Sequence, residues 1–70
     1  MKNNDLAMEV VDSMINEQEE NMGRYILMMN DSREYGDKDY YNYANDLFST
    51  ALKTRNNYIG VKKIMANMDI

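Results

Sequence analysis

The side chains of this chain that could carry chemistry are carboxylates and tyrosines, because its 70 residues include no histidine and no cysteine. The commonest general base, the thiol nucleophile and the usual zinc ligands are therefore missing. Neither of the glycine-rich phosphate-binding motifs, G-x-G-x-x-G and G-x-x-x-x-G-K-[ST], occurs in the sequence. We therefore expect no enzymatic activity, no metal and no cofactor.

Two groups of acidic residues resemble a calcium-binding loop and a catalytic carboxylate pair, but each lacks a required feature. The segment that begins at Asp37 starts like a calcium-binding loop, but Asn42 stands where that loop needs glycine and Phe48 where it needs glutamate. Glu17 and Glu20 share one face of a predicted helix. Without a cleft to set them apart, such a pair is a solvated face and not an acid and a base.

Tyrosines cluster in the stretch KDYYNYANDLF, residues 38–48. By helical spacing Tyr40 is expected in the core and Tyr41 on a second apolar stripe, whereas packing explains neither Tyr43 nor Tyr35. Tyrosine supplies contact area and a hydrogen bond at low entropic cost, so it is common at recognition surfaces. We predict a docking surface for another protein at this end of the molecule; the alternative is a polar loop without function. The predicted partner-binding residues are Arg33, Tyr35, Asp37, Asp39 and Tyr43.

Basic residues cluster near the C-terminus although the net charge is −4. Residues 1–31 hold seven acids and two bases, whereas residues 53–63 hold four bases and no acid. Such a segment could bind the phosphates of RNA or of a nucleotide, with a tyrosine stacked on a base. This hypothesis is the weaker one, because the chain as a whole is acidic and the acids of the first half are expected beside these bases. The residues concerned are Lys53, Arg55, Tyr58, Lys62 and Lys63.

Two long amphipathic helices must position these residues. The sequence has no proline and three glycines, and its apolar positions recur in alternating steps of three and four. The first series is Met8, Val11, Ile15, Gln18, Met22, Tyr25 and Met29; the second is Tyr40, Ala44, Leu47, Ala51, Thr54, Tyr58, Val61, Met65 and Met68. We predict an all-α antiparallel helical hairpin that forms one domain over residues 1–70.

The predicted boundaries are a first helix over about residues 5–30, a turn over about 31–37, and a second helix over about 38–59 or to 68. Gly36 permits a positive φ in the turn, and Asp37 is a good N-cap for the second helix. Gly60 leaves one alternative open, in which the second helix ends there and a short third helix follows. Arg55 is expected to pair with Glu17 or another acid of the first helix and so to set the register.

A second apolar stripe on the second helix cannot be covered by the same partner helix. So small a core, without disulfides, also needs further stabilisation. Both observations predict self-association into a four-helix bundle, most simply a homodimer, or into a larger ring. The predicted oligomer interface is Tyr41, Phe48, Leu52 and Ile59.

The longest apolar run, Tyr25–Met29, is far shorter than the roughly 20 residues that cross a bilayer, and the N-terminus has no apolar signal segment. Many asparagines, methionines and tyrosines beside three arginines suggest the A/T-rich genes of bacteria and their phages. We therefore expect a cytoplasmic, acidic, non-enzymatic protein of the phage or mobile-element type that inhibits or regulates a host protein. An RNA- or nucleotide-binding regulator and a structural or assembly protein are the alternatives.

Overall fold

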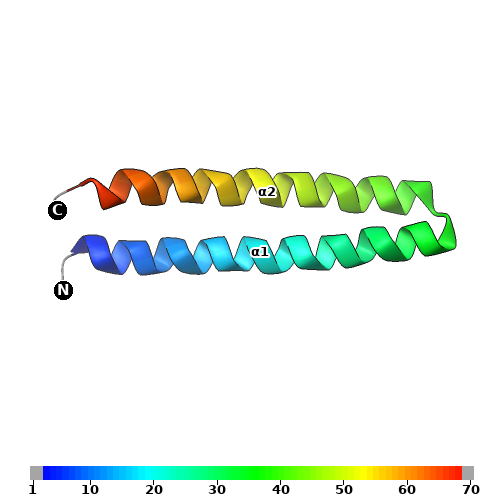
Figure 1. Ribbon diagram of the computed structural model, residues 1–70, viewed down its shortest axis with the longest axis horizontal. Helices are drawn as coiled ribbons and strands as arrows, with labels where there is room; N and C mark the ends of the chain where they lie inside the picture. The colour runs from blue at the N-terminus through cyan, green and yellow to red at the C-terminus, as the bar shows by residue number, and fades with distance from the viewer. Residues whose placement is uncertain (1–2, 69–70) are drawn as a thin grey trace.

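The computed structural model describes residues 3–68, which form two α-helices and no strand. Helix α1 spans Asn3–Tyr35 and α2 spans Lys38–Ala66. The two helices run antiparallel and side by side along their length, so that the start of α1 and the end of α2 lie at the same end of the molecule (Figure 1). The predicted all-α hairpin is confirmed. The alternative with a break at Gly60 is wrong, since α2 continues through this residue to Ala66.

The turn is shorter than the sequence suggested, because α1 continues to Tyr35 through a polar segment. The Ser32 hydroxyl donates to the Met29 carbonyl at 2.8 Å inside the helix. The helix then closes with a Schellman motif, in which the Gly36 N–H donates to the Arg33 carbonyl at 3.2 Å and the Asp37 N–H to the Ser32 carbonyl at 2.9 Å. Gly36 has the expected positive φ of 70°. Only Gly36 and Asp37 therefore connect the helices.

Asp37 begins α2 as predicted. Its carboxylate accepts a hydrogen bond from the Tyr40 N–H at 3.0 Å, and its carbonyl accepts the first helical bond from the Tyr41 N–H, also at 3.0 Å. A side-chain cap of this kind stabilises a helix by about 1 kcal/mol. One residue thus completes the end of α1 and caps the start of α2, which fixes the geometry of the turn.

The seam between the helices uses the predicted positions of α1 but not all those of α2. Every member of the first series is buried or half-buried. In the second series, Tyr40, Val61 and Met68 are exposed, whereas Tyr41 and Phe48 of the second stripe lie half-buried. Placing Tyr40 in the core was therefore wrong. The reason is the rotation of α2 about its axis. The second series includes the buried or half-buried Ala44, Ala51, Tyr58 and Met65, and α1 packs on the side of them that also carries Tyr41 and Phe48.

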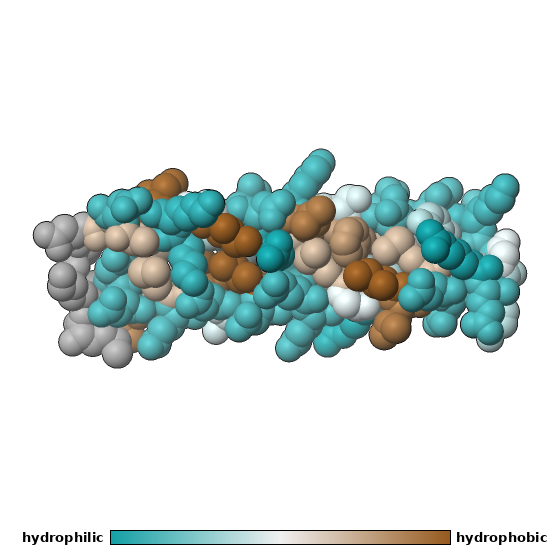
Figure 2. All heavy atoms as spheres, viewed as in Figure 1, coloured by the Kyte–Doolittle hydropathy of each residue, from teal (hydrophilic) through white to brown (hydrophobic). Residues whose placement is uncertain are grey.

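The core is thin. Among the described residues, the buried apolar side chains are Val11, Ala44 and Ala51, and the buried polar one is Ser32. The accessible surface of 5263 Å² exceeds the value of about 4,600 Å² expected for a compact protein of this mass. The Cα atoms span 52 × 16 × 10 Å, so the hairpin is a flat plate with two broad faces. Figure 2 shows one broad face, where apolar side chains follow the line between the helices and polar ones follow the edges.

Polar contacts between the helices fix their register. Arg55 Nε lies 3.2 Å from Glu19 Oε2, and Lys62 Nζ lies 2.7 Å from Asp12 Oδ1. At the open end, Asn4 Nδ2 donates to the Met65 carbonyl at 2.8 Å. The expected pairing of Arg55 with an acid of the first helix is confirmed, with Glu19 in place of Glu17. Because these ion pairs are solvent-exposed, each contributes at most about 1 kcal/mol, and their main effect is on alignment.

Candidate protein-docking surface at the turn

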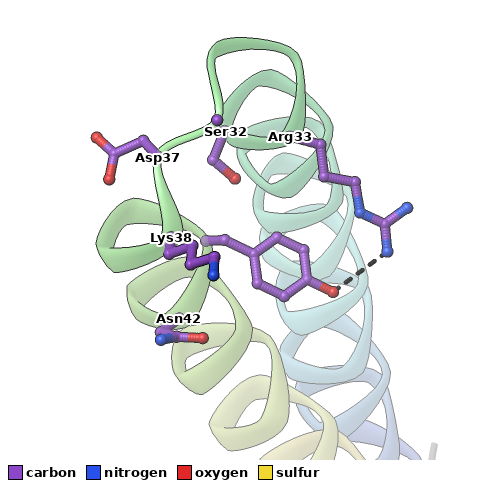
Figure 3. Close-up of a pocket in the computed structure, with 7 residues that line it drawn as sticks. Ser32, Arg33, Asp37, Lys38 and Asn42 are labelled. Carbon is purple, nitrogen blue, oxygen red and sulfur yellow. Dashed lines mark hydrogen bonds between the residues drawn. The ribbon is translucent and has the colours of Figure 1, made fainter.

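A shallow hollow of about 300 Å³ lies beside the turn, where the end of α1 meets the start of α2 (Figure 3). The turn and both helices contribute to its lining. Its lining residues are Ser32, Arg33, Gly36, Asp37, Lys38, Tyr41 and Asn42. We call these residues, together with the neighbouring Tyr35, the turn surface.

Arg33 and Tyr41 form a linked pair across this hollow. The guanidinium carbon lies 5.3 Å from the centroid of the Tyr41 ring, and Arg33 Nη2 donates to the Tyr41 hydroxyl at 3.3 Å (Figure 3, dashed line). Such a cation–π contact contributes about 0.5–1 kcal/mol at an exposed site. The pair joins α1 to α2 and holds two large side chains in place before any partner arrives.

The predicted docking residues do not all meet. Arg33 and Asp37 line the hollow, and Tyr35 stands next to it at the end of α1 with 82% of its surface exposed. Asp39 is exposed in the first turn of α2. Tyr43 is also exposed, but two residues along a helix rotate a side chain by about 200°, so it points to the other side of α2 from Tyr41. The structure therefore separates Tyr43 from the hollow.

Four lining residues were not among the predicted docking residues: Ser32, Lys38, Tyr41 and Asn42. Lys38 and Asn42 are one helical turn apart and so share a wall of the hollow. The signal that would have found them is the Schellman motif at Gly36, because a two-residue turn brings the last turn of α1 against the first turn of α2. The prediction of a long turn concealed this proximity.

The chemistry of the turn surface is that of binding. Arg33, Lys38 and Asn42 supply hydrogen-bond donors, two of them charged, around an aromatic ring. The Asp37 carboxylate is engaged by the Tyr40 N–H and points away from Arg33 (Figure 3). Among the described residues, no three acidic side chains come together as metal ligands. Such a surface can accept a carboxylate or carbonyl group from a partner, with an aromatic ring for the adjoining apolar part.

The basic segment does not form one continuous site. Arg55 and Lys62 turn toward α1, where Glu19 and Asp12 neutralise them. Tyr58 is half-buried, whereas Lys53 and Lys63 are exposed on α2.

The four residues of the predicted oligomer interface, Tyr41, Phe48, Leu52 and Ile59, are half-buried within the single hairpin. Helix α1 therefore already covers part of that stripe, and self-association through it stays a prediction. Neither described helix has an apolar stretch long enough to cross a membrane.

Comparison of this chain with models of known protein families, with curated proteins and with solved structures found no match, so the functional argument rests on the geometry of the hairpin itself.

Proposed function

We propose that this protein is a small non-enzymatic binding protein that docks the turn surface onto another protein. The observation that carries the proposal is the Arg33–Tyr41 pair, held at 3.3 Å beside a hollow of about 300 Å³, with Tyr35 exposed at its rim. Arginine and tyrosine are the residue types most often found where a few side chains supply most of the binding free energy.

Rigidity supports the proposal. The turn is only two residues long, and both of its residues are held by hydrogen bonds to the helix ends. Association loses free energy whenever it must order loops and side chains, so a surface that is already ordered binds at lower cost. Tyr35 is the exposed anchor of this surface, because a tyrosine has few side-chain torsions to fix.

The partner that fits the turn surface is a protein segment that presents an acidic or carbonyl-bearing side chain next to an apolar one. Arg33 and Lys38 would receive the polar group, and the hollow would receive the apolar part. The small size, the negative charge and the biased composition suit an inhibitor or regulator that is encoded by a phage or mobile element and acts on a bacterial host protein in the cytoplasm.

RNA or nucleotide binding by the basic segment is the second candidate, and the ion pairs of Arg55 and Lys62 count against it. A purely structural or assembly role is the third. The latter predicts neither a dedicated partner at the turn nor a salt-sensitive complex with RNA.

Site-specific photo-cross-linking in host cells tests the proposal. A photoreactive residue replaces Asn42 in the turn surface or, as a matched control, Asn56, which is equally exposed and two heptads further along the same side of α2. We expect one dominant protein adduct at position 42, absent at position 56 and lost in an Arg33→Ala/Tyr35→Ala background. The same adducts at both positions, or an adduct that survives the double substitution, would overturn the proposal.

Once identified, the partner can be purified and its affinity measured by calorimetry. Tyr35→Ala is expected to weaken binding roughly 30-fold or more, as truncation of a binding hot spot does. Far-ultraviolet circular dichroism should show unchanged helicity, because Tyr35 is almost fully exposed in the hairpin.

A further inference from the structure

Helix α2 carries a stripe without charge on the flank that α1 does not cover. Its first third is aromatic and apolar, made of Tyr40, Tyr43 and Leu47, and its last third is aliphatic, made of Val61 and Ile64 with Met68 just beyond the C-cap of the helix. Four of these six side chains are 43–65% exposed, namely Tyr43, Val61, Ile64 and Met68. So much apolar surface in one line is unusual for a helix that faces only water.

The middle third of this uncharged stripe is polar and consists of Thr50, Thr54 and Asn57. The Thr54 hydroxyl donates to the Thr50 carbonyl at 2.9 Å, so its donor is satisfied and its methyl group can face an apolar neighbour. All nine positions follow one another in alternating steps of three and four, which is the spacing of a helix–helix seam. Helix α2 contains seven charged residues, and none of them lies on the stripe.

We propose that two copies of this chain pair antiparallel through the uncharged stripe and so form a four-helix bundle. The stripe is symmetric in chemical type about Thr54. Reversing one copy about this residue therefore places the aromatic third of each α2 on the aliphatic third of the other, and Thr50 opposite Asn57. Two identical patches that match under a twofold rotation are what a symmetric dimer requires.

A charge next to the uncharged stripe agrees with the antiparallel direction. Asp46 lies beside its aromatic third, whereas residues 59–68 around its aliphatic third include no acid. An antiparallel pair therefore keeps the two Asp46 carboxylates apart, whereas a parallel pair would place them at the same level. Lys53 lies beside the twofold axis at an exposed position, where it can remain in solvent.

The available area suits a stable dimer. A broad face of 52 × 16 Å offers about 800 Å² per copy, which is the usual contribution of one partner to a specific interface. Exposed Val10 extends the apolar surface onto α1. The hairpin also has only three buried apolar residues among those described, so the dimer would supply the core that the single chain lacks.

This inference differs from the first prediction about self-association, which assigned the interface to Tyr41, Phe48, Leu52 and Ile59. It does not rest on the proposed function. The hollow at the turn lies on the flank of Tyr41, away from Tyr43, so a dimer leaves the turn surface accessible.

A disulfide test addresses the orientation. Position 54 of one copy meets position 54 of the other in a parallel or an antiparallel pair, whereas positions 47 and 61 meet each other only in the antiparallel pair. We expect oxidation to cross-link Thr54→Cys with itself and a mixture of Leu47→Cys and Val61→Cys with each other, and the control variant Asn56→Cys, which projects away from the stripe, to remain uncross-linked. Covalent dimers of Leu47→Cys with itself in place of the mixed dimer would overturn the antiparallel arrangement, and no preferential cross-linking at position 54 would overturn the interface.

Sedimentation equilibrium over a concentration range tests the interface itself. Ile64→Glu puts two charges into the stripe and is expected to raise the dimer dissociation constant at least about 100-fold. Leu27→Glu is the matched control, because Leu27 is equally exposed at 65% but lies on α1 outside the stripe. A wild-type protein that is monomeric at micromolar concentration, or equal dissociation constants for the two variants, would overturn the proposal. If Ile64→Glu fails to fold, the Thr54→Cys result decides.

Discussion

The two flanks of α2 differ in the one property that decides how a helix is used, which is charge. On one flank, Arg55 and Lys62 cross to Glu19 and Asp12 and hold α1 in register. On the other, the uncharged stripe runs from Tyr40 to Ile64 along the helix without a charged side chain. Exposed ion pairs align the two helices but add little to the stability of the fold. An apolar stripe contributes to stability only when another surface buries it. The first flank therefore aligns the hairpin, and the second carries the surface that we propose for association.

The largest effect on stability is expected in the seam between α1 and α2. Ala44 is fully buried, and a larger side chain there must push α1 away from α2. We expect Ala44→Leu to lower the free energy of unfolding by about 2 kcal/mol, measured by urea denaturation. Ala66→Leu is the control, because Ala66 is exposed near the end of α2, and it should change stability little. Equal effects of the two substitutions would show that the seam does not run along Ala44.

Replacing one polar residue at the centre of the uncharged stripe should sharpen the comparison. Asn57→Leu leaves Thr50 and Thr54 as the polar residues of the middle third, and we expect the dimer dissociation constant to fall about 10-fold. A buried polar residue also selects one orientation, and without it the yield of the mixed Leu47→Cys/Val61→Cys cross-link should fall. A weaker dimer with this substitution would argue that position 57 lies outside the interface.

Reversing a charge on the opposite flank should affect the hairpin and not the dimer. Glu19→Lys brings two positive charges together at Arg55 and is expected to cost about 0.5–1 kcal/mol of stability at low salt. The double variant Glu19→Arg/Arg55→Glu should restore most of it. A thermal melt of each protein at low and high salt measures this, and failure of the double variant to recover would mean that the pair does not set the register.

The smallest effect concerns the edge of the uncharged stripe. Asp46→Lys should change the dimer dissociation constant only a few-fold, since one exposed charge at the edge contributes little. Sedimentation of this variant beside Ile64→Glu provides the test. An effect of Asp46→Lys as large as that of Ile64→Glu would mean that position 46 lies inside the interface.

The nucleic-acid hypothesis predicts that the protein shifts RNA in a gel, whereas docking at the turn surface and pairing through the uncharged stripe predict no such shift. With Arg55 and Lys62 already paired, we expect no salt-sensitive gel shift with RNA at about 50 mM salt, either for the wild type or for Lys62→Glu/Lys63→Glu. A gel shift with RNA that the wild type shows and the double variant lacks would support binding of RNA by the basic segment.

The local features of this fold were accessible from the sequence. The spacing of Met8 to Met29 identified the inner face of α1 correctly, and Gly36 and Asp37 were assigned to their roles at the turn. These features depend on residues only a few positions apart, through helical periodicity, capping and the freedom of glycine to adopt a positive φ. The end of α1 was placed too early, because polar residues in a last helical turn resemble a loop.

The sequence did not predict which stripe of α2 faces α1. Ala44, Ala51, Tyr58 and Met65 complete a seam equally well with Tyr40 and Val61 or with Tyr41 and Phe48, so the two choices are related by a rotation of α2 about its axis. The choice also decides whether Tyr41 meets Arg33 at the hollow and where Tyr43 points. The residues of the turn surface were for this reason only partly predicted.

The amino-acid sequence by itself determined that there are two long helices, where α2 begins and how the chain reverses, because each depends on short-range hydrogen bonds and side-chain periodicity. Only the tertiary structure decided the rotation of α2, the pairing of Arg55 with Glu19 and the separation of Tyr43 from the turn surface. The physical reason is that two rotations of an amphipathic helix bury similar apolar area. The difference between them comes from a few contacts between residues far apart in the chain.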